Sequence, residues 1–202
     1  TSLRIVNLIK WYLSGIEITD KESTSLTVQV RHLFLNLERH ILGNHLFANL
    51  TALIFAGLFF DSKESNIWLS FALRHMEKQI LEQVLPDGGN FELSPMYHSI
   101  FLRDLLDVVV IFNTFEREVP KIVLVTIPKM VFWIDCMTHP NGEFAFFNDT
   151  ALNVAFSTEE LKIFAASLGF KPLVSDSKLI VLEDSGYIRI EKENYVCILD
   201  TA

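Results

Sequence analysis

Two polar stretches of this sequence contain residue types that can do acid–base chemistry. The first is the tripeptide Gly43-Asn44-His45, which is followed by Asn49. The second is the segment 85–98, which holds two carboxylates, a tyrosine and a histidine. Such side chains move protons in enzyme active sites, and a primary amide donates hydrogen bonds to developing negative charge. The two stretches could therefore supply a base or acid together with hydrogen-bond donors.

In the second stretch, Ser94 followed by Pro95 is typical of a helix N-cap and a first helical residue. Tyr97 and His98 then lie in the first helical turn, where the helix dipole and free N–H groups favour a bound carboxylate or a tyrosinate. A tyrosine packed in the core explains Tyr97 equally well. The residues alone leave both interpretations open.

Other polar residues of these loops have a structural explanation beside a functional one. Glu92 with Asp87 could form the carboxylate pair of a glycosidase. Acidic residues five positions apart in a turn are, however, more often solvated. The polar run Asn148-Asp149-Thr150 could line a cleft, and turn formation explains it as simply.

In the first stretch, helix capping explains most of the sequence. Gly43 suits the left-handed residue that ends one helix, and Asn44 suits the N-cap of the next. Asn49 is a polar residue on an otherwise apolar helix, so we expect it to find a buried partner.

Apolar residues recur at helical spacing over most of the chain and then alternate, which predicts helices followed by strands. The expected helices are 3–13, 26–42, 46–60, 67–84, 97–115, 119–137 and 158–168, and the expected strands are 179–182, 187–190 and 195–199. Short connections predict antiparallel helical hairpins. We therefore expect a mainly α domain over residues 1–173 and the beginning of an antiparallel β-domain over 174–202.

Composition excludes several classes of protein. The net charge of −8 argues against nucleic acid as a partner, because binding would need a basic stripe, and it suits an acidic substrate poorly. The apolar run 46–60 is interrupted by Asn49 and Thr51 and is too short for a transmembrane segment. Cys136 and Cys197 lack the spacing of a metal or redox motif, so we expect two buried free thiols, with no metal and no cofactor.

Long segments of the chain resemble the heparinase II/III family of polysaccharide lyases. The matching segments are 37–60, 85–108, 139–152 and 182–200. The resemblance implies an incomplete α/α toroid followed by a large antiparallel β-sandwich, with a cleft between them for an acidic glycan. The family pattern continues with a histidine-bearing strand beyond Ala202, and the chain begins at Thr1. We therefore expect a piece of a larger bacterial protein, truncated early in its β-sandwich and inactive alone.

The family reaction is β-elimination at a uronic acid, in which a base removes the C5 proton and the 4-linked oxygen leaves. Removal of this proton requires neutralisation of the adjacent carboxylate. The resemblance assigns that task to Asn44 and the acid–base role to Tyr97, so we expect both side chains to face one cleft. Five further residues are expected to bind or support the substrate: His45, Asn49, Glu92, His98 and Asn148.

Two other functions remain open from the sequence. One is a relative that binds glycans or serves surface-polysaccharide biosynthesis without catalysis. The other is a toroidal glycoside hydrolase that uses Glu92 or Asp149. The resemblance also implies a periplasmic or envelope-associated location, which the residues themselves do not indicate.

Overall fold

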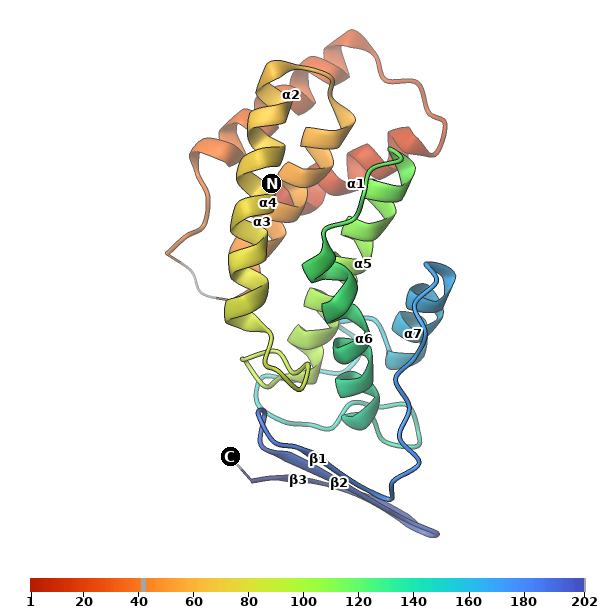
Figure 1. Ribbon diagram of the computed structural model, residues 1–202. Helices are drawn as coiled ribbons and strands as arrows, with labels where there is room; N and C mark the ends of the chain where they lie inside the picture. The colour runs from red at the N-terminus through yellow and green to blue at the C-terminus, as the bar shows by residue number, and fades with distance from the viewer. Residues whose placement is uncertain (41–42, 202) are drawn as a thin grey trace. The chain divides into compact units, whose positions relative to one another are not determined.

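The computed structural model describes residues 1–40 and 43–201, in which seven α-helices precede a small β-sheet (Figure 1). The elements are α1 (Ser2–Leu13), α2 (Asp20–Leu35), α3 (Asn44–Phe59), α4 (Lys63–Gln83), α5 (Pro95–Thr114), α6 (Lys121–Cys136), α7 (Thr158–Ser167), β1 (Leu179–Leu182), β2 (Tyr187–Lys192) and β3 (Tyr195–Asp200). The prediction of a mainly α fold that ends in antiparallel strands is confirmed.

The chain forms two compact units. The first unit contains Thr1–Gln79 and Ile111–Arg117, and the second contains Ile80–Val110 and Glu118–Ala202. Helices α4 and α5 each contribute to both units. The second unit holds helical segments and the whole sheet, and the domain boundary expected at residue 173 stays a prediction.

Helix α3 forms the core of the first unit. Its residues from Asn49 to Gly57 are all buried, as expected for a helix that is apolar almost all round. Gly57 allows α4 to approach closely, because a Cβ atom placed on it would lie 2.7 Å from the Cβ of Leu69. A side chain at this position would therefore force the two helices apart.

The predicted bounds of the second helix, 26–42, are wrong for the part that the structure describes. The helix begins at Asp20 because Thr19 and Glu22 form a capping box, with reciprocal bonds of 3.3 and 2.9 Å between backbone and side chains. This polar first turn is invisible to apolar periodicity. The helix ends at Leu35, where the Asn36 amide donates to the His32 carbonyl at 2.8 Å. Residues 41 and 42 lie outside the described residues.

Two tight turns of the same construction lie in the second unit, one after α4 and one after α6. In Pro86-Asp87-Gly88 the glycine N–H donates to the Leu85 carbonyl at 2.9 Å, and in Pro140-Asn141-Gly142 the glycine donates to the His139 carbonyl at 2.9 Å. Both glycines have positive φ, 98° and 85°. An isolated antiparallel bridge flanks each turn, between Val84 and Asn90 and between Thr138 and Phe144.

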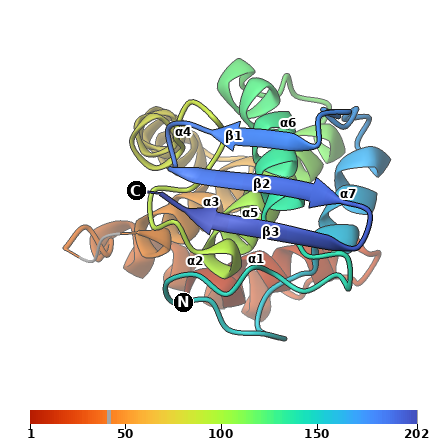
Figure 2. The same ribbon diagram turned by 90° about the horizontal axis from the view of Figure 1, so that it is seen from below.

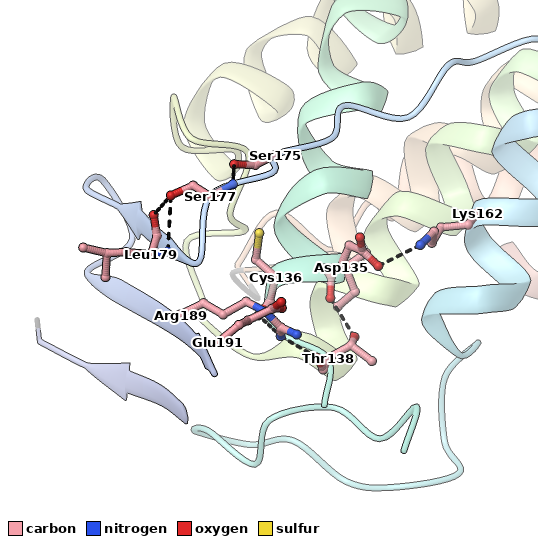
Figure 3. Close-up of polar contacts among 10 residues, drawn as sticks. Asp135, Cys136, Thr138, Lys162, Ser175, Ser177, Leu179, Arg189 and Glu191 are labelled. Atoms are coloured by element: carbon pink, nitrogen blue, oxygen red, sulfur yellow. Dashed lines mark hydrogen bonds and ion pairs between the residues drawn. The ribbon is translucent and has the colours of Figure 1, made fainter. Parts of the chain in front are cut away.

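The three strands form an antiparallel sheet in the order β1-β2-β3 (Figure 2). Arg189 of β2 joins this sheet to the carboxyl end of α6, where its Nη1 donates to the Cys136 carbonyl at 2.9 Å and to the Thr138 carbonyl at 2.6 Å (Figure 3). Its Nε pairs with Glu191 at 2.6 Å. A guanidinium is favourable at this position because the carboxyl end of a helix carries partial negative charge.

Both cysteines are free, as the sequence predicted. Cys136 is buried and Cys197 is half-buried, so the expectation of two fully buried thiols holds only for Cys136. Burial raises the pKa of the Cys136 thiol to about 12.

Candidate functional site

Tyr97 lies in the first turn of α5 and is half-buried. The helix begins at Pro95, and its Tyr97 N–H points to the Ser94 hydroxyl oxygen at 3.5 Å. The predicted start of this helix, with Ser94 before it and proline as the first helical residue, is confirmed. Tyr97 thus lies where helix N–H groups and the dipole favour an anion.

The backbone immediately before α5 is held by residues from two distant segments. Leu93 has a φ of 55°, and its carbonyl accepts from the Asn148 amide at 2.9 Å and from the Tyr187 hydroxyl at 3.2 Å. The next residue, Ser94, is buried and shares a 3.1 Å hydrogen bond with Thr150. Asn148, one of the predicted site residues, therefore contacts the segment that leads into Tyr97.

His98 is fully buried beside Tyr97 in the sequence. Its Nδ1 accepts from the Asn90 N–H at 3.2 Å and its Nε2 lies 2.9 Å from the Met130 carbonyl, so the ring proton belongs on Nε2. The ring also stacks on Trp133, with 4.5 Å between centroids. Burial lowers the pKa of His98 to about 4, although the Met130 bond opposes this shift. Both ring nitrogens are thus used inside the protein.

The turn that precedes this region is tied to the sheet by a carboxylate. Asp87 Oδ2 accepts from the N–H and the hydroxyl of Ser185 at 2.7 and 2.8 Å, and Oδ1 accepts from the Gly89 N–H at 2.9 Å. The Trp133 indole donates to the same Ser185 hydroxyl at 2.8 Å. These bonds use both Asp87 oxygens, which weighs against a glycosidase pair of Asp87 and Glu92.

Glu92 is half-buried, and its N–H donates to the Asn90 side-chain oxygen at 3.0 Å. It belongs to the same loop as Asp87 and to the same unit as Tyr97. The second unit thus contains four of the predicted site residues: Glu92, Tyr97, His98 and Asn148.

Asn44 is the first residue of α3 and is half-buried. The N-cap is Gly43, with a φ of 82°, so the sequence placed the cap one residue too late. Gly43, with its positive φ, is therefore the residue that precedes and caps α3. His45 is exposed, and its Nδ1 lies 3.8 Å from Glu38.

The predicted buried partner of Asn49 is confirmed. Its amide oxygen accepts from the Glu38 N–H at 3.0 Å, and its nitrogen donates to the Glu38 carboxylate at 2.8 Å and to the Ser2 hydroxyl at 2.9 Å. Asn49 therefore joins α3 to α1 and to the segment before α3.

Asn44, His45 and Asn49 belong to the first unit, and Tyr97 belongs to the second. The expectation that Asn44 and Tyr97 face one cleft stays a prediction. Sequence reasoning missed the roles of Thr150, Ser185 and Tyr187. Only for Tyr187 was there a signal, because a tyrosine on a buried strand position needs a partner for its hydroxyl.

The described residues contain no cluster of three or more side chains able to hold a metal ion. Among the helices that the structure describes, none is both long and apolar enough to cross a membrane.

The model of the family "Heparinase II/III N-terminus" matches residues 11–168. The chain belongs to the heparinase II/III family. It is 35% identical over 115 residues to a heparin-sulfate lyase from Bacteroides stercoris, an alignment covering 54% of this chain and 17% of that protein. It is 27% identical over 146 residues to a heparin-sulfate lyase from Pedobacter heparinus, covering 67% and 22% of the two chains. The matched part of this heparinase II/III chain thus spans about a fifth of the length of these relatives.

Solved heparinases share the fold of this heparinase II/III chain. A crystal structure of heparinase III aligns with a TM-score of 0.77 at 16% identity, over 98% of this chain and 36% of that one. A heparan sulfate lyase from Pedobacter heparinus aligns with a TM-score of 0.65 at 21% identity, over 89% and 31%. The likeness confirms the predicted α/α toroid segment followed by the first strands of a β-domain.

Proposed function

We propose that this chain is part of a polysaccharide lyase that cleaves a uronate-containing glycan by β-elimination. The observation that carries the proposal is the placement of Tyr97 in the first turn of α5. The residues just before this turn are held by Asn148 and Tyr187, which both donate to the Leu93 carbonyl. A base must be held in position against the proton that it removes, because misplacement is costly in rate. The heparin-sulfate lyases among its relatives support the same reaction class.

In this reaction Tyr97 removes the C5 proton or protonates the leaving oxygen. Asn44 neutralises the uronate carboxylate by hydrogen bonding, and its place at the first residue of α3 adds the positive end of the helix dipole. Neutralisation lowers the energy of the carbanion-like transition state, which is why a donor and a base must act together.

The other predicted residues fall into two groups, those with polar atoms bonded inside the protein and those with more exposed side chains. His98 and Asn49 have polar atoms occupied inside the protein, so their proposed task is to hold Tyr97 and Asn44 in place. His45 is exposed and Glu92 is half-buried, and both are proposed to contact the glycan beyond the reacting sugar.

We also propose that the chain needs a further segment of the natural protein for catalysis. The chain covers only 36% and 31% of the two solved relatives, so each of them is about three times as long as this chain. We propose that this further segment supplies the catalytic histidine that the family resemblance implies.

The test is the substitution Tyr97→Phe in the whole natural protein, assayed with a panel of uronate polymers through the ultraviolet absorbance of unsaturated products. The turnover number is expected to fall at least ~10³-fold with little change in KM, because the ring stays and only the proton-transfer group is lost. Tyr195→Phe is the matched control, since Tyr195 is an exposed tyrosine of β3.

Two outcomes would contradict the proposal. Full activity of Tyr97→Phe would remove Tyr97 from the chemistry. Binding of a uronate polymer without any unsaturated product from the natural protein would instead identify a glycan-binding relative that no longer catalyses.

A further inference from the structure

We propose that Tyr187 and Asn148 are positioning residues for Tyr97, which they hold through the carbonyl of Leu93. This inference rests on the proposed function for its effect on rate, and on the geometry of the second unit for its physical basis. Neither residue is proposed to touch the glycan.

The conformation of Leu93 is the feature that needs support. Its φ of 55° lies in the left-handed region, which is unfavourable for a residue with a branched side chain. Its N–H donates to the Asn90 carbonyl at 2.8 Å, so the chain turns sharply here. Four residues later the same chain presents Tyr97, and a change at Leu93 would therefore shift the first turn of α5.

Both supporting bonds converge on one atom. The Leu93 carbonyl oxygen accepts from the Tyr187 hydroxyl at 3.2 Å and from the Asn148 amide at 2.9 Å. The Asn148 amide nitrogen also lies 3.5 Å from the Tyr187 hydroxyl oxygen, so it contacts this oxygen as well as the Leu93 carbonyl oxygen. A carbonyl that accepts two hydrogen bonds is restrained in direction as well as in position.

Tyr187 is itself rigidly held. Its side chain has 0% exposure, and its ring lies 6.0 Å from that of Trp133 and 5.0 Å from that of Phe147. In β2 it pairs with Leu182 on one side and Asp200 on the other. Burial raises the pKa of its hydroxyl to about 12, so the proton needed for donation to Leu93 stays in place.

Asn148 acts from a second element. It also has a left-handed backbone, with a φ of 49°, which asparagine tolerates well. Two residues later Thr150 bonds to Ser94 at 3.1 Å, so one loop contacts two consecutive residues before α5. The sheet and this loop thus restrain the same short segment, and the loop also contacts Tyr187.

The experiment compares Tyr187→Phe and Asn148→Ala with the control Tyr195→Phe in the whole natural protein. The positioning variants are expected to lower the turnover number about tenfold with KM unchanged within about twofold, because misplacement of a base by less than ~1 Å costs rate rather than binding. Tyr195→Phe removes an exposed hydroxyl from the same sheet and is expected to match the wild type.

Amide hydrogen exchange over residues 93–98 provides a readout that does not depend on catalysis. Tyr187→Phe is expected to increase exchange in this segment about tenfold, while the helix α6 against which the sheet packs exchanges as in the wild type. Unchanged exchange in residues 93–98 would overturn the proposal whatever the activity. Loss of protection throughout the protein would also overturn it, since Tyr187 would then serve general stability.

A rescue variant tests the route through Leu93. Leu93→Asn in the Tyr187→Phe background is expected to recover at least threefold in turnover, because asparagine adopts the left-handed conformation more readily than leucine. No recovery would mean that Tyr187 affects the rate by another route, and the proposal would be wrong. A wild-type protein without lyase activity would refute the proposed function, and the exchange measurement would still decide the positioning role.

Discussion

At the scale of single residues, burial decides which of the polar side chains remain available for chemistry. His98 follows Tyr97 directly, yet its ring nitrogens bond to Asn90 and Met130 and its ring stacks on Trp133. A residue type typical of catalysis thus serves to hold the core of the second unit together.

The low pKa of His98 makes stability depend on pH. Its folded value of about 4 lies below the ordinary value of 6.5, so the unfolded chain binds more protons between these values. The stabilising contribution is therefore complete above pH 6.5 and is lost as the pH falls toward 4. Between pH 7.5 and 4.5 the free energy of unfolding is expected to fall by roughly 2 to 3 kcal/mol through this group.

Urea denaturation of the chain at the two pH values measures this loss. In His98→Gln the free energy of unfolding is expected to fall less between these pH values than in the wild type, by the contribution of His98. The control His40→Gln, at an exposed position, is expected to show the same fall as the wild type. An equal pH dependence in His98→Gln and wild type would show that the buried imidazole is not the titrating group.

At the scale of elements, the packing of the sheet on α6 depends on a few polar contacts. Asp87, in the turn after α4, bonds to Ser185, and Arg189 bonds to the carbonyls of Cys136, the last residue of α6, and of Thr138. Gly89 leaves room for this packing, because a Cβ atom on it would lie 2.6 Å from the Trp133 indole nitrogen. A sheet of three strands is stable when one of its faces is covered, and these contacts hold it on the helical segment of the second unit.

Substitution of Arg189 by methionine tests this packing. Arg189→Met leaves the Cys136 and Thr138 carbonyls buried without their charged donor, and it is expected to lower the free energy of unfolding by about 3 kcal/mol. Lys192→Met, at an exposed position of the same strand, is the matched control and is expected to change stability by less than ~0.5 kcal/mol. Equal stability of the two variants in chemical denaturation would refute the role of Arg189.

At the scale of the whole molecule, the proposed chemistry is divided between two units. Asn44 lies in the first unit and Tyr97 in the second. The acidic chain, with a net charge of −8, also lacks the positive surplus expected of a site for a polyanion. We therefore expect a further part of the natural protein to supply cationic groups for the proposed substrate.

Assay of the 202-residue chain by itself tests this dependence. The chain is expected to form no detectable unsaturated product from any uronate polymer that the whole natural protein cleaves, because catalytic groups that act as a unit lose most of their effect when one is missing. Circular dichroism of the same sample checks that its helices are folded. Robust product formation by the chain would contradict the proposed need for a further segment.

Much of the fold was predictable because secondary structure depends on near neighbours in the sequence. Helical and alternating apolar periods identified all ten elements, and Ser94-Pro95 identified the start of α5. The beginning of α2 was missed because a capping box is a polar signal that apolar periodicity does not contain. The need of Asn49 for a buried partner was also predictable, whereas the identity of that partner was not.

The sequence by itself thus determined the elements, the family resemblance and the residue types available for catalysis. Only the tertiary structure decided how these residues are used: Asp87 bonds to Ser185 98 positions away, and the Leu93 carbonyl bonds to Tyr187 94 positions away. The physical reason is that a buried polar group takes its partner from whichever segment packs against it. That choice depends on the path of the whole chain, which local propensities do not encode.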